Sequence, residues 1–169
     1  MTHDTFHLMG EGILPYRTNQ ATQTLEALPQ GDFVRNLRGD LVFLGAQGGH
    51  KYKSTVQGFD PHPPTFGSLM CGQKVIVYAM ERLLESASGP GVHLTRPPVP
   101  ESLFGMNAQG NTIPVILEEN GWVRVDNWEQ DTGIYLSYCP VLTMMITGFS
   151  LGKSGNTQQP LWTMTLEEV

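Results

Sequence analysis

The sequence is poor in charged residues. Aspartate, glutamate, lysine and arginine make up 15% of its 169 residues, whereas about a quarter is usual for a soluble protein. The formal net charge is −6 and no stretch is rich in lysine or arginine, which argues against nucleic acid as the main partner. So little charge predicts a surface covered by threonine, glutamine, asparagine, serine and backbone groups, or else by a neighbouring subunit.

Cysteine is scarce as well, with Cys71 and Cys139 as the two examples. One pair of distant cysteines cannot provide the disulfide framework of a small secreted protein. We therefore expect two free, buried thiols. A cysteine nucleophile activated by a distant histidine stays open as an enzymatic alternative, although one residue of each type is a weak signal.

The sequence lacks a secretory signal and a membrane-spanning run. Its first residues, MTHDTFHLMGEG, have neither the basic start nor the apolar centre of a signal peptide. No run reaches the ~18 apolar residues that a membrane span needs. We expect a protein that is made in the cytoplasm and has no membrane partner.

The histidines and acidic residues do not form metal-binding motifs. His3 and His7 lie four residues apart, but no helical pattern around them would bring both rings to one metal ion. Asp126, Glu129 and Asp131 lack the ligand alternation and the glycine of a calcium loop. We predict no metal and no other cofactor.

The motifs of common enzyme classes are missing too. Glu118 and Glu119 adjoin each other at the end of a predicted strand, so they point to opposite faces and do not suit a paired acid and base. There is no G-x-S-x-G nucleophile elbow, and glycine-rich pieces such as GAQGGH lack the spacing of a phosphate-binding loop. We predict that the protein is not an enzyme and has no catalytic residues.

What the sequence does contain is alternation with a period of two, which is typical of half-buried β-strands. Near the C-terminus, two runs alternate large apolar residues with mainly threonine; the apolar positions are Leu142, Met144, Ile146, Trp162, Met164 and Leu166. We predict an antiparallel pair joined by a loop over 151–159. Further strands are expected at 22–28, 51–58 and 75–80, with a helix over 79–85 as the alternative to the end of the last one.

Two hairpins are predicted from their turn residues. Phe33–Leu37 and Leu41–Leu44 flank Arg38-Gly39-Asp40, where glycine suits a turn with positive φ. The tripeptide Arg-Gly-Asp is also an adhesion signal for integrins, but the turn explains it more simply. The second hairpin has Asn120-Gly121 at its turn, a strong short-range hairpin signal.

These patterns predict a mainly β protein, an antiparallel β-sandwich or barrel. We expect an extended N-terminal arm over 1–20 with one short strand at Phe6–Met9, and a single β domain over 21–169. A long Pro/Gly-rich loop at 85–111 exceeds an ordinary connection, which predicts either a functional excursion or an arm that lies on a partner. The arm and this loop supply the candidate interface residues Phe6, Leu8, Tyr16, Leu94, Val99, Leu103, Phe104 and Met106.

Four segments in order, TQTLEAL, KYKSTVQG, GQKVIVYAMERLL and YCPVLTMMITGFS with PLWTMTLEEV, resemble strands of small virion structural proteins of tailed bacteriophages. The resemblance covers roughly 20–84 and 134–169 and does not extend to 85–131. It implies a structural subunit of the phage particle, assembled in the host cytoplasm, that contacts its own copies and other virion proteins.

The resemblance does not fix the place in the particle; the tail is our preferred expectation, and a capsid-decorating or head–tail joining protein is the alternative. Tryptophans and tyrosines in or beside predicted strands suit core or interface positions; they are Trp122, Trp128, Trp162, Tyr135 and Tyr138. Aromatic residues exposed on the surface would instead suit a module that binds a surface glycan, which is the alternative of another class.

Overall fold

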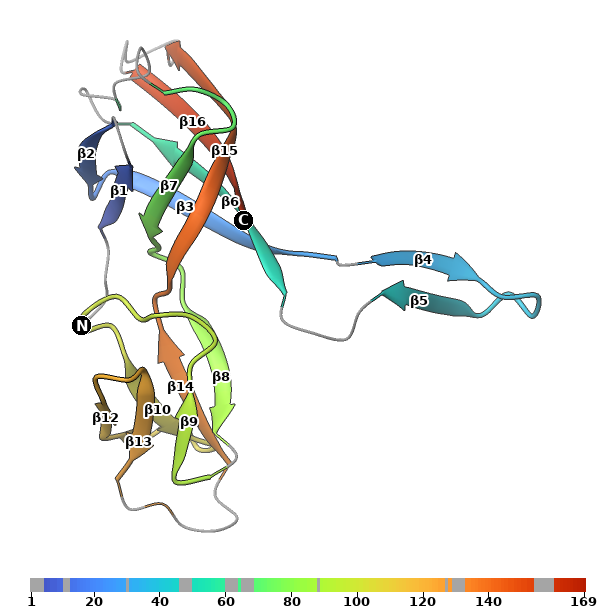
Figure 1. Cartoon of the computed structure of the whole chain (residues 1–169), viewed down its shortest axis with the longest axis vertical. Helices are drawn as coiled ribbons and strands as arrows, with labels where there is room; N and C mark the ends of the chain where they lie inside the picture. Colours follow the sequence, from blue (N-terminus) through green and yellow to red (C-terminus); the bar gives the residue numbers. More distant parts are fainter. Residues whose placement is uncertain are drawn as a thin grey trace.

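A computed structural model describes residues 5–10, 13–29, 31–45, 50–59, 64, 69–87, 89–126, 128, 133–153 and 160–169. These residues form β-strands, turns and irregular connections, without a helix, and all strand pairs are antiparallel. The prediction of a mainly β, antiparallel fold is confirmed. Figure 1 shows three parts: a large sheet, a smaller module below it and a hairpin that projects to one side.

The large sheet has seven strands in the order β2-β1-β7-β15-β16-β6-β3. Their bounds are β1 Phe6–Gly10, β2 Ile13–Thr18, β3 Ala21–Leu28, β6 Lys51–Gly58, β7 Lys74–Tyr78, β15 Val141–Lys153 and β16 Pro160–Glu168. The predicted strands at 22–28, 51–58 and 75–80 correspond to β3, β6 and β7. The predicted C-terminal pair is confirmed as β15 with β16, and β16 lies inside the sheet between β15 and β6.

The core of the large sheet follows the predicted alternation. The six apolar residues of β15 and β16 named above are each at most 1% exposed. The indole of Trp162 packs edge-on against Tyr16 with 5.6 Å between ring centroids, and Phe6 lies 6.5 Å away. Burial of each large apolar side chain contributes about 1.5–3 kcal/mol, so this layer is the main source of stability.

Residues 6–10 and 13–18 are part of this sheet, which corrects the expectation of an extended arm over 1–20. The predicted short strand is present as β1, but β2 adds a second strand and β1 also pairs with β7. Phe6 and Leu8 are both 0% exposed. Short strands interrupted by glycine and proline give too little alternation for the sequence alone to identify them.

The smaller module lies between β7 and β15 in the chain. It contains a four-stranded sheet, β11-β10-β14-β8, and a three-stranded sheet, β12-β13-β9. The bounds are β8 Leu83–Ala87, β9 Gly91–His93, β10 Phe104–Asn107, β11 Thr112–Ile113, β12 Val115–Leu117, β13 Trp122–Val125 and β14 Ile134–Tyr138. The two sheets enclose their own core, made of Ala87, Val123, Val125, Ile134 and Leu136.

Two expectations change in this module. The segment 85–111 is not one long loop, because it contains the end of β8, all of β9 and all of β10. Strands of three to five residues separated by proline and glycine are too short to show the apolar–polar alternation by which a strand is predicted. The helix alternative over 79–85 is also wrong, since the chain bends after β7 and continues into β8.

The third part is the hairpin of β4 (Gly31–Arg35) and β5 (Leu41–Gly45), which confirms the predicted turn. Gly39 has a φ of 86° and meets nothing within 4 Å at its Cβ position. The Oδ1 atom of Asn36 accepts the N–H groups of Arg38 and Asp40, both at 2.9 Å. The second predicted hairpin is likewise confirmed, by β12, β13 and the 79° φ of Gly121.

Candidate functional site: an apolar hairpin and a cleft

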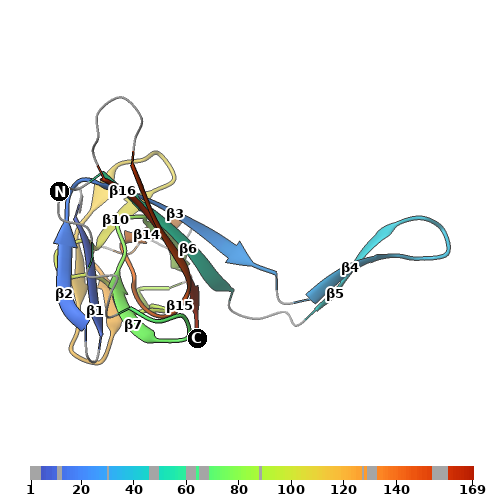
Figure 2. The ribbon, with the colours of Figure 1, turned by 90° about the horizontal axis from the view of Figure 1, so that it is seen from above.

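The β4–β5 hairpin exposes large apolar side chains along its whole length. The exposed fraction is 62% for Phe33, 61% for Leu41 and 60% for Leu44, and Val34, Val42 and Phe43 are also exposed. Figures 1 and 2 show that the hairpin extends away from both the large sheet and the module. Contiguous apolar surface of this kind marks an interaction site in a soluble protein.

The register places apolar residues on both faces of the hairpin. Phe33 lies opposite Phe43 with 5.0 Å between ring centroids, and these rings share a face with Leu41. Val34 lies opposite Val42 on the other face, which also carries Leu44. A two-stranded ribbon by itself is marginally stable in water. Apolar residues on both faces therefore favour a partner that encloses the ribbon.

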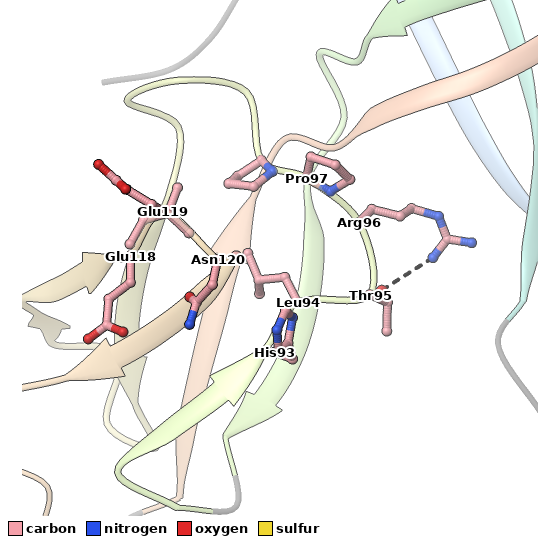
Figure 3. A pocket seen from close by; sticks show the side chains of 11 residues that line it. His93, Leu94, Thr95, Arg96, Pro97, Glu118, Glu119 and Asn120 are labelled. Atoms are coloured by element: carbon pink, nitrogen blue, oxygen red, sulfur yellow. Dashed lines mark hydrogen bonds between the residues drawn. The ribbon is translucent and has the colours of Figure 1, made fainter.

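A cleft of about 560 Å³ opens on the module, between residues 93–98 and the β12–β13 turn at 117–121. Its apolar lining consists of Leu94, Pro97, Pro98 and Leu117. Glu118 and Glu119, both exposed, belong to the turn that forms one wall, and Figure 3 shows their carboxylates splayed apart and directed away from Leu94 and Pro97. The adjacent Asn120 accepts the backbone N–H of Trp122 at 2.8 Å, which orders the turn. The cleft thus has apolar walls, and two carboxylates lie on the outer side of its rim.

The one arginine that lines the cleft, Arg96, turns its charge away from it (Figure 3). Its Nε lies 2.7 Å from a carboxylate oxygen of Glu168, and its guanidinium lies over the ring of Tyr52, 4.8 Å from the centroid. Burial lowers the pKa of Arg96, but Glu168 raises it, and the net shift is upward. Arg96 therefore stays charged and paired, and the acidic rim is not neutralised by it.

A second hollow of about 380 Å³ shares Thr95 and Arg96 with the cleft and extends toward Glu85. The hydroxyl groups of Tyr138 and Thr95 both donate to Glu85, and the backbone N–H of Thr95 approaches the same carboxylate at 3.2 Å. Burial, followed by the bond to Glu85, raises the pKa of Tyr138. This carboxylate is occupied by internal donors, which indicates a structural role.

The structure places the eight predicted interface residues mostly inside the protein. Phe6, Leu8 and Val99 are at most 3% exposed. The others are half-buried: Tyr16, Leu94, Leu103, Phe104 and Met106. Tyr16, Leu94 and Leu103 pack on the two cores, and Phe104 lies under the guanidinium of Arg82 at 4.4 Å. Most of these side chains thus stabilise this chain itself, and only Leu94 also lines the cleft.

The hairpin residues were missed as a contact site, although the sequence held a signal. A half-buried strand alternates apolar and polar residues, whereas LVFLG and FV put apolar residues at successive positions beside a short turn. Such a pattern in a hairpin covers both faces of the ribbon. The cleft has no comparable signal, because its two walls come together only through the pairing of β13 with β9 and β12.

The prediction that both cysteines are free is confirmed, and the prediction that both are buried is wrong for Cys71. Both are free, as expected, but Cys71 is exposed and Cys139 is buried. Cys71 lies in a turn before β7, and its neighbour Gly72 has a φ of 88°. The thiol of Cys139 lies 3.4 Å from the carbonyl oxygen of Met80. The tertiary surroundings of each cysteine decide the exposure of its thiol.

Within the described ranges, no group of three histidine, cysteine, aspartate or glutamate side chains could hold a metal ion. His3, Glu129 and Asp131, which the sequence offered as weak candidates, lie outside these ranges. The same part of the chain has no helix of the length and apolar character that crossing a membrane requires.

In comparisons with known proteins, no family model and no curated protein sequence matches this chain. The resemblance to virion proteins of tailed bacteriophages therefore stays a prediction. The hairpin and the cleft are the two features whose geometry bears on function.

Proposed function

We propose that this protein is a non-enzymatic structural subunit that works by self-association and by contacts with other proteins of a particle. The projecting hairpin carries the proposal, because both of its faces are apolar and exposed. Burying its phenylalanine, valine and leucine side chains gains about 25 cal/mol per Å² of apolar surface. That gain is realised only when a partner covers the hairpin.

The particle we propose is that of a tailed bacteriophage, with the tail as the preferred place. The support is the resemblance of four strand segments described above, together with the low content of charged residues. Repeated copies in such a particle make many individually weak contacts collectively strong. A capsid-decorating or head–tail joining protein would use the same hairpin and is the alternative within this class.

Glycan binding has less support from the geometry. Trp162 and Tyr138 are 0% exposed, and Trp128 packs on the core of the module. Trp122 is half-buried with its ring edge-on to His93 at 5.9 Å. These four side chains are occupied by the protein itself. Of the five aromatic residues considered, Tyr135 alone is exposed, at 45%, which leaves one ring as a platform for a sugar.

Light scattering across a dilution series tests the proposal. We expect the wild-type chain to form a defined oligomer and Phe33→Ser/Phe43→Ser to shift it toward monomer. Met70→Ser/Ile76→Ser is the matched control, because it removes two exposed apolar side chains outside the hairpin. Circular dichroism checks that each variant is folded. A wild-type protein that stays monomeric at every concentration would contradict self-association.

A further inference from the structure

The tip of the hairpin holds an apolar side chain out in solvent. Leu37 is 108% exposed, and its neighbour Arg38 is exposed as well. The turn beneath them is well ordered: Arg35 donates to the carbonyl oxygen of Gly39 at 2.7 Å, and Asn36 donates to the carboxylate of Asp40 at 3.0 Å. An ordered tip loses little conformational freedom on binding, which favours its use as a contact.

The cleft on the module is complementary to this tip in both size and character. A volume of about 560 Å³ falls in the range that accommodates a small ligand or a few side chains. Its leucine and proline walls suit a leucine, and its two rim carboxylates suit an arginine. Arg96 does not oppose that arginine, because its guanidinium is paired with Glu168 outside the cleft.

We propose that the hairpin tip of one copy docks into the cleft of a second copy. Leu37 then packs between Leu94 and Leu117, and Arg38 meets Glu118 or Glu119. The hairpin projects from the large sheet away from the module that carries the cleft, so a tip cannot reach the cleft of its own chain (Figures 1 and 2). This inference rests on the proposed function and names the partner surface.

The charge match is local to the tip. The hairpin as a whole is balanced, with Asp32 and Asp40 against Arg35 and Arg38, and Asn36 holds the carboxylate of Asp40. Arg35 donates to the carbonyl oxygen of Gly39, so Arg38 is the arginine of the tip that is available to a partner. Such a pair at the rim of an apolar contact contributes mainly to specificity and is weakened by salt.

A tip-to-cleft contact is heterologous, because the two surfaces differ. Contacts of this type produce a closed ring when the rotation between copies closes, and an open filament when it does not. Either outcome leaves every internal copy with one occupied tip and one occupied cleft. The contact therefore suits a subunit that is repeated around or along an axis.

Cysteine cross-linking between two different molecules tests the contact. Both carry Cys71→Ser, which removes the exposed native thiol; one has Leu37→Cys and the other Leu117→Cys. We expect mild oxidation to cross-link the mixture, because a disulfide requires Cβ atoms within about 4.5 Å. Leu37→Cys mixed with Glu26→Cys is the control, since Glu26 is exposed on β3, a strand that contributes no residue to the cleft lining. Equal cross-linking in both mixtures would overturn the proposal.

Charge reversal gives an independent test by light scattering. We expect Arg38→Glu, and separately Glu118→Arg/Glu119→Arg, to weaken association about tenfold, which corresponds to about 1.4 kcal/mol. Combining the three changes should restore most of the association. The control Arg124→Glu reverses an exposed charge on β13, outside the cleft lining.

The outcomes separate this inference from the proposed function. If the hairpin variant Phe33→Ser/Phe43→Ser dissociates the oligomer while no cross-link forms with Leu117→Cys, the proposed function stands and the docking is wrong. Efficient cross-linking of Leu37→Cys with itself would mean that hairpins pair with each other, and would also overturn the docking. A chain that never associates would overturn both.

Discussion

Arg96 and Glu168 form a two-point ion pair that joins the module to the large sheet. The Nε and Nη2 atoms of Arg96 lie 2.7 and 2.9 Å from the two carboxylate oxygens of Glu168. The side chains are 14% and 13% exposed. Glu168 also accepts the backbone N–H of Tyr52 at 3.0 Å, which ties β6 to the same point. The last strand thus connects the two parts of the protein through one carboxylate.

Substitution of this pair should destabilise the protein. We expect Glu168→Gln or Arg96→Lys to lower the free energy of unfolding by about 2 kcal/mol, because each loses charged hydrogen bonds in a partly buried place. Urea denaturation followed by circular dichroism measures the change. Glu81→Gln, at an exposed position, should stay within about 0.5 kcal/mol of wild type. Equal stability of all these proteins would show that the pair contributes nothing.

The raised pKa of Tyr138 leads us to expect a loss of stability in alkaline solution. Its pKa is raised in the folded protein, by burial first and by Glu85 second, so above pH ~10 the unfolded chain releases the phenolic proton before the folded one does. Stability is therefore complete below pH ~10 and falls by up to about 1.4 kcal/mol per pH unit above it. Urea denaturation at several pH values measures this slope.

Two variants separate Tyr138 from the other alkaline titrations. Tyr138→Phe should make the loss of stability above pH ~10 shallower. Tyr135→Phe, in the same strand but 45% exposed, should keep the wild-type slope. If Tyr138→Phe has the slope of wild type, the raised pKa does not contribute to stability.

Gly58 should not tolerate a side chain. A Cβ atom there would overlap the indole ring of Trp162, which lies opposite it in the β16–β6 pair. Overpacking of a core costs roughly 1–3 kcal/mol, so we expect Gly58→Ala to lower the midpoint of thermal unfolding clearly. Gly133→Ala, where a Cβ meets nothing within 4 Å, serves as the control. A Gly58→Ala protein with an unchanged midpoint would mean that the indole is free to move aside.

The two cysteines should react at different rates. We expect a thiol reagent to label one thiol per folded chain rapidly, because Cys71 is exposed and Cys139 is buried. The second thiol should react only when the chain unfolds. Cys71→Ser should abolish the fast reaction and leave the slow one. Rapid labelling of both thiols in the native protein would contradict the burial of Cys139.

The strands and turns that the sequence predicted are those with strong local signals. Alternation over six or more residues identified β3, β6 and the β15–β16 pair. The glycines at positions 39 and 121 identified the two turns, and both have a positive φ in the structure. Short strands between prolines and glycines were not identified, which is why 85–111 was expected to be a loop. An apolar–polar alternation of three to five residues cannot be distinguished from a chance arrangement, whereas a longer one can.

The sequence by itself determined that the chain is β-rich, that its C-terminal strands are half-buried and where two hairpins turn. Only the tertiary structure decided that Phe6 and Leu8 belong to the core, that the segment between β7 and β15 has a core of its own, and that the apolar hairpin is left uncovered. The reason is physical. Alternation in the sequence shows which side chains are apolar on one face of a strand. Long-range strand pairing decides which of these side chains are buried within the same chain.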